Sequence, residues 1–214
     1  MIIVSSWKEP KFNNRLIDRL IVAAESSHVE PIIIINKIDL DINGQSIKWI
    51  DLYENIGYKI FGTSVTKNLG IDNLNYELKG KTNLIWGHSG VGKSSILNSI
   101  YPGLNLKVGK ISKNTSKGSH TTVTSLLSFV DEETRIIDTP GIREIDPYGI
   151  RKEDLGHYFK EFSSFICNCR FNTCTHFHEP GCVVVDAFNK GLISDERYQS
   201  YLNILDTIEN DLFF

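Results

Sequence analysis

The sequence has no long hydrophobic run and no sign of a secretory leader. Its longest clearly apolar stretch covers residues 31–35, which is far too short to cross a bilayer. The first four residues, MIIV, lack the basic segment and the long apolar core of a signal peptide. The sequence therefore predicts a cytosolic, cytoplasmic protein with no membrane partner.

The chain also lacks an excess of basic residues. Its formal net charge is −3, which argues against attraction of the whole protein to nucleic acid, although a local basic patch could still bind it. There are no internal repeats, and a content of 41% hydrophobic and 23% charged residues is typical of a packed globular protein. A length of 214 residues suits one α/β domain with a small appendage.

Cysteine is scarce, and all four cysteines lie between positions 167 and 182. In a cytosolic chain such clustering indicates a metal site rather than disulfides. Three cysteines and one histidine have suitable spacing: Cys169-x₄-Cys174-x-His176-x₅-Cys182. A Cys₃His set suits one tetrahedral Zn²⁺ per chain, and a closed site leaves no position for a catalytic water, so the zinc would be structural. Cys167 and His178 lie nearby as alternative ligands, and a group of free thiols is the remaining alternative.

Apolar runs alternate with helix-like stretches over most of the chain, which is the pattern of a parallel sheet with crossover helices. Residues 32–35 form a continuous β-branched run, as a strand buried on both faces requires. The expected strands cover residues 2–4, 32–35, 58–62, 82–86, 123–130 and 135–137. The expected helices cover residues 13–27, 46–55, 71–78, 93–100, 153–162, 183–189 and 195–212.

The pattern changes beyond Pro147, which predicts a domain of residues 1–149 and a C-terminal module of residues 150–214. In this module the helical stripe of Tyr198, Tyr201, Leu202 and Leu205 is expected to be core rather than a binding face. The same expectation extends to Phe188 and Leu192.

A phosphate-binding loop follows the expected strand 82–86 and opens the expected helix 93–100. It reads Gly87-His88-Ser89-Gly90-Val91-Gly92-Lys93-Ser94, continued by Ser95, and matches G-x-x-x-x-G-K-[ST]. The glycines let backbone N–H groups surround phosphates at the helix N-terminus. Lys93 should reach the β- and γ-phosphates, and Ser94 should bind Mg²⁺.

The second half of a triphosphate site is Asp138-Thr139-Pro140-Gly141, which closes an apolar strand. Asp138 would hold Mg²⁺ through water, and the N–H of Gly141 would meet the γ-phosphate. A plain turn is the alternative for this segment taken alone.

The base is indicated by Asn36-Lys37-Ile38-Asp39, which follows the buried strand. The carboxylate of Asp39 can accept two hydrogen bonds from the N1–H and N2–H₂ groups of guanine, which adenine does not offer. Lys37 would lie over the base, and Asn36 would join neighbouring loops. The segment Thr63-Ser64-Val65 matches the companion motif, whose backbone contacts the guanine O6.

These base-reading motifs precede the phosphate loop, whereas the usual order places the phosphate loop first. The rotation leaves the site intact because all the loops lie at the carboxyl edge of one parallel sheet. The sequence therefore predicts an α/β fold, a P-loop GTPase domain with circularly permuted motif order, followed by a small zinc-binding helical module.

With these motifs in place, the chain resembles the circularly permuted, ribosome-associated GTPases of the RsgA (YjeQ) family. The resemblance rests on NKIDL at 36–40, GHSGVGKSS at 87–95, GSHTTV at 118–123, DTPGIRE at 138–144 and the Cys/His cluster. It implies a GTP hydrolase that acts late in the maturation of the small (30S) ribosomal subunit and is stimulated by that subunit. The implied partners are GTP, GDP, 16S rRNA and ribosomal proteins, and the chain is expected to be a monomer.

The same resemblance implies that Cys169, Cys174, His176 and Cys182 are the zinc ligands. Family members usually carry an N-terminal OB-fold that contacts ribosomal RNA, and this chain begins where that domain would end, through either truncation or loss.

Residues 108–122 are expected to be the first switch segment, in which Thr121 or Thr122, with Thr122 favoured, binds Mg²⁺ and senses the γ-phosphate. Many GTPases place a water-orienting Gln directly after D-x-x-G, but this position is Ile142 here. The family suggests His120 as the catalytic replacement, since an imidazole can position or polarise water. The competing interpretations are a nucleotide-gated RNA or protein binding module with negligible hydrolysis, and an ATPase, which the NKID motif disfavours.

Overall fold

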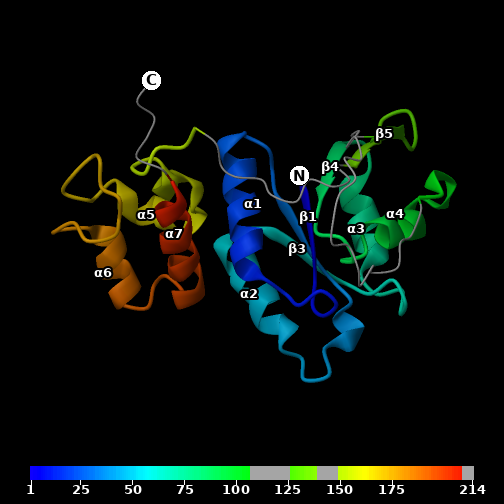
Figure 1. Ribbon diagram of the computed structural model, residues 1–214, viewed down its shortest axis with the longest axis horizontal. Helices are drawn as coiled ribbons and strands as arrows, with labels where there is room; N and C mark the ends of the chain where they lie inside the picture. Colours follow the sequence, from blue (N-terminus) through cyan, green and yellow to red (C-terminus); the bar gives the residue numbers. More distant parts are fainter. Residues whose placement is uncertain (107–125, 139–148, 209–214) are drawn as a thin grey trace, which may run out of the picture. The chain divides into compact units, whose positions relative to one another are not determined.

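The computed structural model describes residues 1–106, 126–138 and 149–208. The chain divides into two compact units (Figure 1). The sheet unit comprises residues 1–12 and 31–144, and the helical unit comprises residues 13–30 and 145–214. The chain thus leaves the sheet unit after its first strand, forms one helix of the helical unit, and then returns.

The sheet unit is built on six strands in the spatial order β3-β2-β1-β4-β6-β5. The strands are β1 (Ile2–Ser6), β2 (Ile32–Asn36), β3 (Lys59–Thr63), β4 (Thr82–Trp86), β5 (Leu126–Phe129) and β6 (Arg135–Asp138). β5 runs antiparallel to β6, and the other neighbouring pairs are parallel. The predicted α/β class is confirmed.

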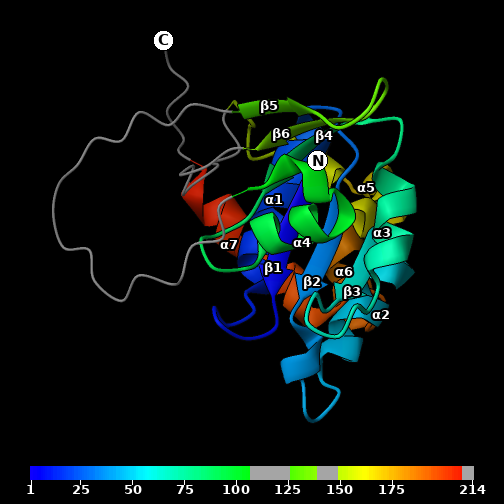
Figure 2. The same ribbon diagram turned by 90° about the vertical axis from the view of Figure 1, so that its right-hand side faces the viewer.

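One face of this sheet carries the principal core of the unit. Successive side chains of a strand point to opposite faces, and Ile2 and Val4 of β1 share a core cluster with Ile34 of β2. The cluster continues into α3 (Ile71–Leu78) and α4 (Lys93–Ile100), which lie side by side on that face (Figure 2). The remaining elements of the unit are η1 (Ile38–Leu40), α2 (Ser46–Ile56) and η2 (Pro102–Leu104).

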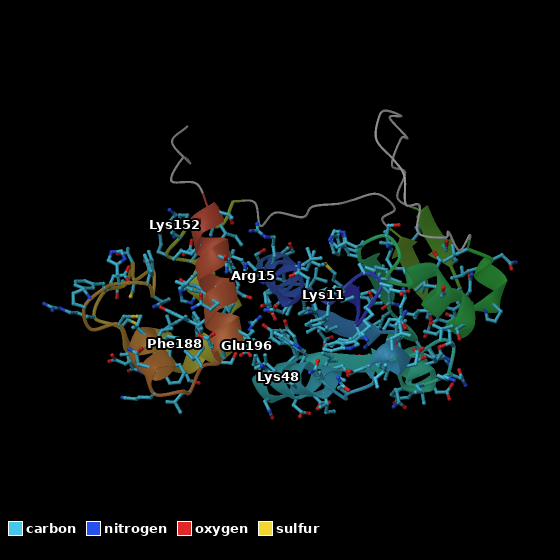
Figure 3. The ribbon with its side chains drawn as sticks, turned by 60° about the horizontal axis from the view of Figure 1, so that its bottom comes forward. Lys11, Arg15, Lys48, Lys152, Phe188 and Glu196 are labelled. Carbon is cyan, nitrogen blue, oxygen red and sulfur yellow. The ribbon has the colours of Figure 1, made fainter. Side chains whose placement is uncertain are left out.

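The helical unit packs α1 against the C-terminal elements. Its elements are α1 (Asn14–Ser26), η3 (Leu155–Tyr158), η4 (Lys160–Phe162), α5 (Ser163–Ile166), α6 (Val183–Asn189) and α7 (Asp195–Thr207). Val22 of α1 shares a core with Phe159, Phe162 and Tyr201. Phe188 of α6 (labelled in Figure 3) stacks on Tyr198 of α7, with ring centroids 4.1 Å apart.

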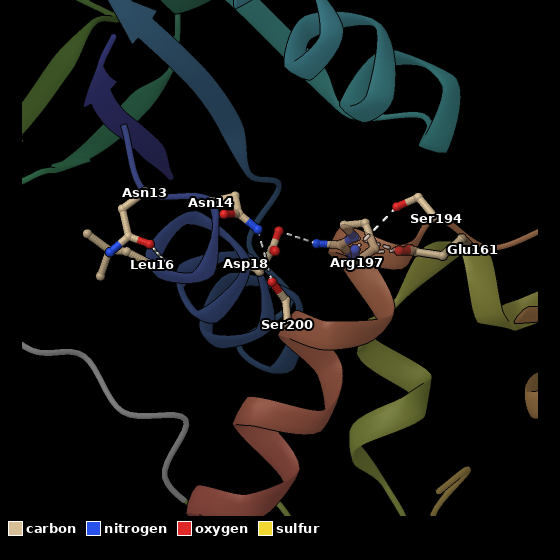
Figure 4. Close-up of polar contacts among 8 residues, drawn as sticks. All are labelled: Asn13, Asn14, Leu16, Asp18, Glu161, Ser194, Arg197 and Ser200. Carbon is tan, nitrogen blue, oxygen red and sulfur yellow. Dashed lines mark hydrogen bonds and ion pairs between the residues drawn. The ribbon is translucent and has the colours of Figure 1, made fainter. Parts of the chain in front are cut away.

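A buried ion cluster joins α1, η4 and α7 within the helical unit (Figure 4). Arg197 is 1% exposed and donates from Nη1 to Asp18, which is fully buried. The same guanidinium donates from Nε and Nη2 to the two oxygens of Glu161, at 2.5 and 3.1 Å. Its planar face lies over the ring of Phe159, 4.5 Å from the centroid. One buried cation thus compensates two carboxylates, and removing it would leave both without their counter-ion.

Both long helices of this unit begin at side-chain caps. The Oδ1 atom of Asn13 accepts from the Leu16 N–H at the start of α1, and the Ser194 Oγ accepts from the Arg197 N–H at the start of α7 (Figure 4). Such caps satisfy backbone donors that have no partner inside the helix. Within the described ranges, none of the helices combines the length and apolar character that a membrane span requires.

The structure corrects the helix predicted for residues 153–162, which forms the two 3₁₀ turns η3 and η4. The buried side chains of Leu155, Phe159 and Phe162 recur at helical spacing, which made the segment resemble a helix. The backbone of Phe159 is extended, with φ −107° and ψ 102°. The ring of His176 also lies so close to Gly156 that a Cβ there would come within 2.6 Å of it.

The stripe on α7 is core as predicted, since Tyr198, Tyr201 and Leu205 are buried. The expectation for Leu192 is wrong, because that side chain is 64% exposed. α7 ends at Thr207, and positions 209–212 of the predicted helix lie outside the described residues. The boundary near Gly149 stays a prediction; the structure groups residues 13–30 with the C-terminal part of the chain.

Candidate functional site

Three loops lie at the carboxyl edge of the sheet unit. They follow β2, β3 and β4 and contain residues 36–39, 63–70 and 87–93. The chain runs outward from β1 to β2 and β3 and then crosses back to β4, on the other side of β1. The strand order therefore reverses between β1 and β4, and such switch points are where open α/β sheets bind ligands.

Asn36 connects all three loops. Its Nδ2 donates to the Val91 carbonyl at 2.8 Å, and its Oδ1 accepts from the Thr63 hydroxyl at 3.1 Å. Asn36 and Thr63 are buried, so these bonds are shielded from water. Gly92 has φ +101°, and a Cβ there would lie 2.3 Å from the Asn36 amide nitrogen. The glycine is therefore needed both for the left-handed backbone and for the close approach of Asn36.

The phosphate loop ends at the N-terminus of α4, which begins at Lys93. Helix N-termini present free backbone N–H groups and favour anions. Lys93 Nζ donates to the carbonyls of Gly87 at 2.5 Å and His88 at 3.2 Å. Lys37 Nζ donates to the carbonyl of Gly90 at 2.8 Å. Two ammonium groups thus lie against the loop, and the oxygens of a bound polyphosphate could replace the carbonyls as acceptors from Lys93.

The predicted base-reading residues lie beside this loop. Lys37 has a left-handed backbone, with φ +60°, and precedes the short turn η1 that carries Asp39. The Asp39 side chain is exposed, and its Oδ2 accepts from the Thr66 hydroxyl at 3.2 Å. The pKa of Asp39 is lowered, first by hydrogen bonding from the Ser64 hydroxyl and with smaller contributions from Thr66 and Lys67, against the raising effect of burial. Asp39 is therefore held as a carboxylate, the form that can accept from a base.

Only some of the residues predicted to bind Mg²⁺, to contact the γ-phosphate or to act in catalysis are described. Ser94 lies in the first turn of α4. Asp138 is the last residue of β6, and its backbone pairs with β4 two residues before the phosphate loop. Gly141, Thr122 and His120 lie outside the described residues.

The predicted metal ligands meet in the helical unit. The ligand atoms of Cys169, Cys174, His176 and Cys182 all lie within 4.8 Å of one another. His176 Nδ1 is 3.6 Å from the Cys169 sulfur and 3.5 Å from the Cys182 sulfur, and those sulfurs are 4.0 Å apart. The edges of a tetrahedral Zn–S and Zn–N site measure about 3.5–3.8 Å. The cluster could therefore hold a metal ion. The alternative ligands Cys167 and His178 are exposed and do not belong to it.

Burial sets the protonation of the cluster. Burial raises the pKa values of Cys174 and Cys182, and burial lowers that of His176. These groups are thus neutral without a metal, whereas a bound cation would deprotonate the thiols.

Glu179 stabilises the loop that carries the candidate metal ligands by accepting hydrogen bonds from it. Burial by itself raises the pKa of Glu179. Hydrogen bonds from Thr175 and from the Phe177 N–H outweigh this effect and lower the pKa to about 2. Two tyrosines of α7 support the same loop, because Tyr198 donates to the His176 carbonyl and Tyr201 to the Thr175 carbonyl.

Comparison with known proteins decides the family. The sequence profile of the RsgA GTPase family matches residues 1–148, which is more than half of the chain. The chain belongs to the RsgA GTPase family. Similar proteins include "small ribosomal subunit biogenesis GTPase RsgA 2" of Bacteroides thetaiotaomicron, 41% identical over 212 residues, and the RsgA of Phocaeicola vulgatus, 43% identical over 212 residues. These matches cover 97% of the chain and 68% of each relative.

Solved structures agree with this RsgA assignment. YjeQ from Thermotoga maritima matches with a TM-score of 0.79 at 37% identity, over 96% of this chain and 69% of that one. YloQ, described as a circularly permuted GTPase, matches with a TM-score of 0.75 at 29% identity, over 96% and 66%. The permuted GTPase fold expected from the motif order is confirmed.

Sequence reasoning missed several supporting residues of this RsgA family member. Thr66 lies only two positions beyond the companion motif, and its contact with Asp39 depends on the shape of the loop after β3. The hydrogen bond from Lys37 to Gly90 and the role of Glu179 also have no sequence signature. A hydroxyl residue close to a motif was the one signal that could have indicated Thr66.

Proposed function

We propose that this protein binds GTP at the carboxyl edge of its sheet and hydrolyses it to GDP and phosphate as a maturation factor of the small ribosomal subunit. The observation that carries the proposal is the Asn36 connection, because it joins the base-reading and phosphate loops into one site. The family membership supplies the reaction, and the printed names of the relatives supply the ribosomal partner.

In this proposal each group of residues at the sheet edge has its own role. Asp39 reads guanine, with Lys37 over the base and the backbone of Ser64 and Val65 near its O6. Residues 87–95 hold the phosphates, and the N–H of Gly141 contacts the γ-phosphate. Ser94, Thr122 and Asp138 hold Mg²⁺, whose chemical contribution is to neutralise charge that develops on the phosphate oxygens. His120 orients the attacking water in place of a glutamine.

The metal cluster has a structural role in this proposal. Cys169, Cys174, His176 and Cys182 are the ligands of one Zn²⁺, since three thiolates and one imidazole are a donor set that zinc prefers. The ribosomal partner comprises 16S rRNA and proteins of the small subunit. A monomer working in the cytoplasm, where that subunit matures, fits this role.

Nucleotide competition tests the base assignment. A fluorescent GDP analogue bound to the purified protein with Mg²⁺ should be displaced by GTP and GDP at micromolar concentrations, and by ATP or ADP only at concentrations at least about 100-fold higher, because adenine lacks the paired donors that Asp39 accepts. Equal displacement by ATP would overturn the guanine assignment.

A further inference from the structure

The loop after β3 is a closed turn that points back to the base-reading carboxylate. Ser64 and Leu69 exchange both backbone hydrogen bonds, with N···O distances of 3.0 and 2.9 Å. The turn closes through Asn68 and Gly70, which both have positive φ. A Cβ at Gly70 would lie 2.4 Å from the Gly62 carbonyl oxygen, so the loop lies tightly against the end of β3. The backbone that carries its hydroxyl groups is therefore held close to the end of β3.

Two of these hydroxyls form a chain of hydrogen bonds that ends on the carboxylate of Asp39. Ser64 Oγ and Thr66 Oγ1 are 3.0 Å apart, and Thr66 Oγ1 is 3.2 Å from Asp39 Oδ2. At the start of the chain, the backbone N–H of Lys67 donates to Ser64 Oγ at 3.2 Å.

The direction of this chain follows from the number of protons. An ionised carboxylate only accepts, so the single proton of Thr66 is used toward Asp39. Ser64 also has a single proton, which it gives either to Thr66 or directly to Asp39, and its oxygen accepts from the Lys67 N–H. In both arrangements the hydroxyl protons are directed toward the Asp39 carboxylate, and hydrogen bonds in such a network strengthen one another. Ser64 is fully buried, which anchors the chain in the body of the sheet unit.

We propose that Thr66 is a positioning residue for guanine recognition, which fixes the orientation of the Asp39 carboxylate and thereby sets the preference for guanine over bases that lack its 2-amino group. This inference rests on the proposed function and adds a specificity determinant to the same site.

Such a residue is needed because of the geometry of the contact between guanine and the Asp39 carboxylate. The terminal torsion of an aspartate is broad, yet two donors of one planar base must meet its two oxygens at the same time. The carboxylate has about four acceptor positions, so Thr66 can occupy one while guanine occupies two. Because a bound base would exclude water, the bond from Thr66 is strongest in the complex.

The test compares GDP with inosine diphosphate, which keeps N1–H but lacks the 2-amino group. The affinity ratio of the two nucleotides should fall about three- to tenfold in Thr66→Val, as expected for one hydrogen bond. Thr66→Ser keeps the hydroxyl and should retain the wild-type ratio. Thr82→Val is the matched control, because Thr82 is an exposed threonine at the opposite, amino end of β4. Thr66→Ala removes the hydroxyl in a second way if the valine variant folds poorly.

A pH series supplies a readout that a purely structural role would not change. GDP binding needs the ionised carboxylate, so affinity falls as the pH drops through the pKa of Asp39. Loss of the Thr66 donor should raise that pKa, and the decline should begin at a higher pH in Thr66→Val than in the wild type.

The inference is overturned if Thr66→Val melts normally and keeps both the GDP to inosine diphosphate ratio and the pH profile of the wild type. A wild-type protein that fails to prefer GDP over ADP would instead reject the proposed function. The two failures are therefore distinguishable within one set of titrations.

Discussion

The two candidate sites of this protein are held together in opposite ways. At the sheet edge, loops carrying residues 36–39, 63–70 and 87–93 are joined by direct hydrogen bonds, and the group that would read the base is exposed. In the helical unit, three of the four candidate ligands are buried, and all four ligand atoms lie within 4.8 Å of one another. The described loops of the edge site are thus held together by the protein itself, whereas the Cys/His cluster could hold a metal ion.

This difference predicts that substitutions in each unit affect separate properties. Changes at the Cys/His cluster, or at the buried ion pairs of Arg197, should reduce the stability of the helical unit. Changes at the sheet edge should alter nucleotide binding or turnover and leave the zinc content intact.

The largest effect is expected for Cys174→Ser. Structural zinc binds with a free energy on the order of 10 kcal/mol, which is comparable to the whole stability of a domain. The variant should therefore lose its zinc and the native packing around Tyr201. Metal analysis and near-ultraviolet circular dichroism measure both. Cys167→Ser is the control, because Cys167 is exposed and outside the cluster. A Cys174→Ser protein with a full equivalent of zinc would refute the ligand assignment.

Arg197→Met should be the next most severe change. It leaves the carboxylates of Asp18 and Glu161 without their buried cation, at a cost of about 3–5 kcal/mol. Chemical denaturation would show the loss. Arg151→Met should not be measurably destabilised, because the ion pairs of Arg151 lie at the surface. Equal midpoints for the two variants would contradict the role of Arg197 in joining α1 to α7.

Asp39→Asn should weaken GDP binding roughly 100-fold, because an acceptor of two hydrogen bonds becomes partly a donor. Xanthosine diphosphate, which carries a carbonyl where guanine has its amino group, should bind the variant better than it binds the wild type. Isothermal titration measures both, and Asp51→Asn on the exposed side of α2 is the control. Unchanged GDP affinity would remove Asp39 from the base site.

His120→Ala should lower turnover by about 100-fold, the lower end of what general catalysis by one side chain contributes. GTP affinity should stay near that of the wild type. Single-turnover hydrolysis with and without small ribosomal subunits measures the change. If the stimulated rate of the variant equals that of the wild type, His120 has no catalytic role.

Much of the fold follows from local patterns that this sequence displays clearly. The β-branched run 32–35 and the phosphate loop between β4 and α4 are dictated by burial and by the demands of bound phosphate, so their positions could be predicted. The Cys₃His cluster was also predictable, because the spacing of three cysteines and a histidine already brings them close together.

Other features depend on tertiary contacts that no local pattern carries. The helical spacing of Leu155, Phe159 and Phe162 describes which side chains are buried, and two 3₁₀ turns achieve the same burial. The membership of α1 in the helical unit depends on Asp18 reaching Arg197, 179 residues away. The contact between Thr66 and Asp39 requires the closed turn after β3, which sequence alone does not reveal.

The most direct test of the central claim is GTP turnover measured with and without purified small ribosomal subunits. Slow intrinsic hydrolysis is expected because Ile142 stands where many GTPases have a glutamine. A rate that rises at least about tenfold with added subunits, and does not rise with large subunits, is the predicted result, because GTPase partners accelerate hydrolysis by completing the site. A rate that small subunits leave unchanged, in protein that binds GTP normally, would contradict the proposed function and favour a nucleotide-gated binding module.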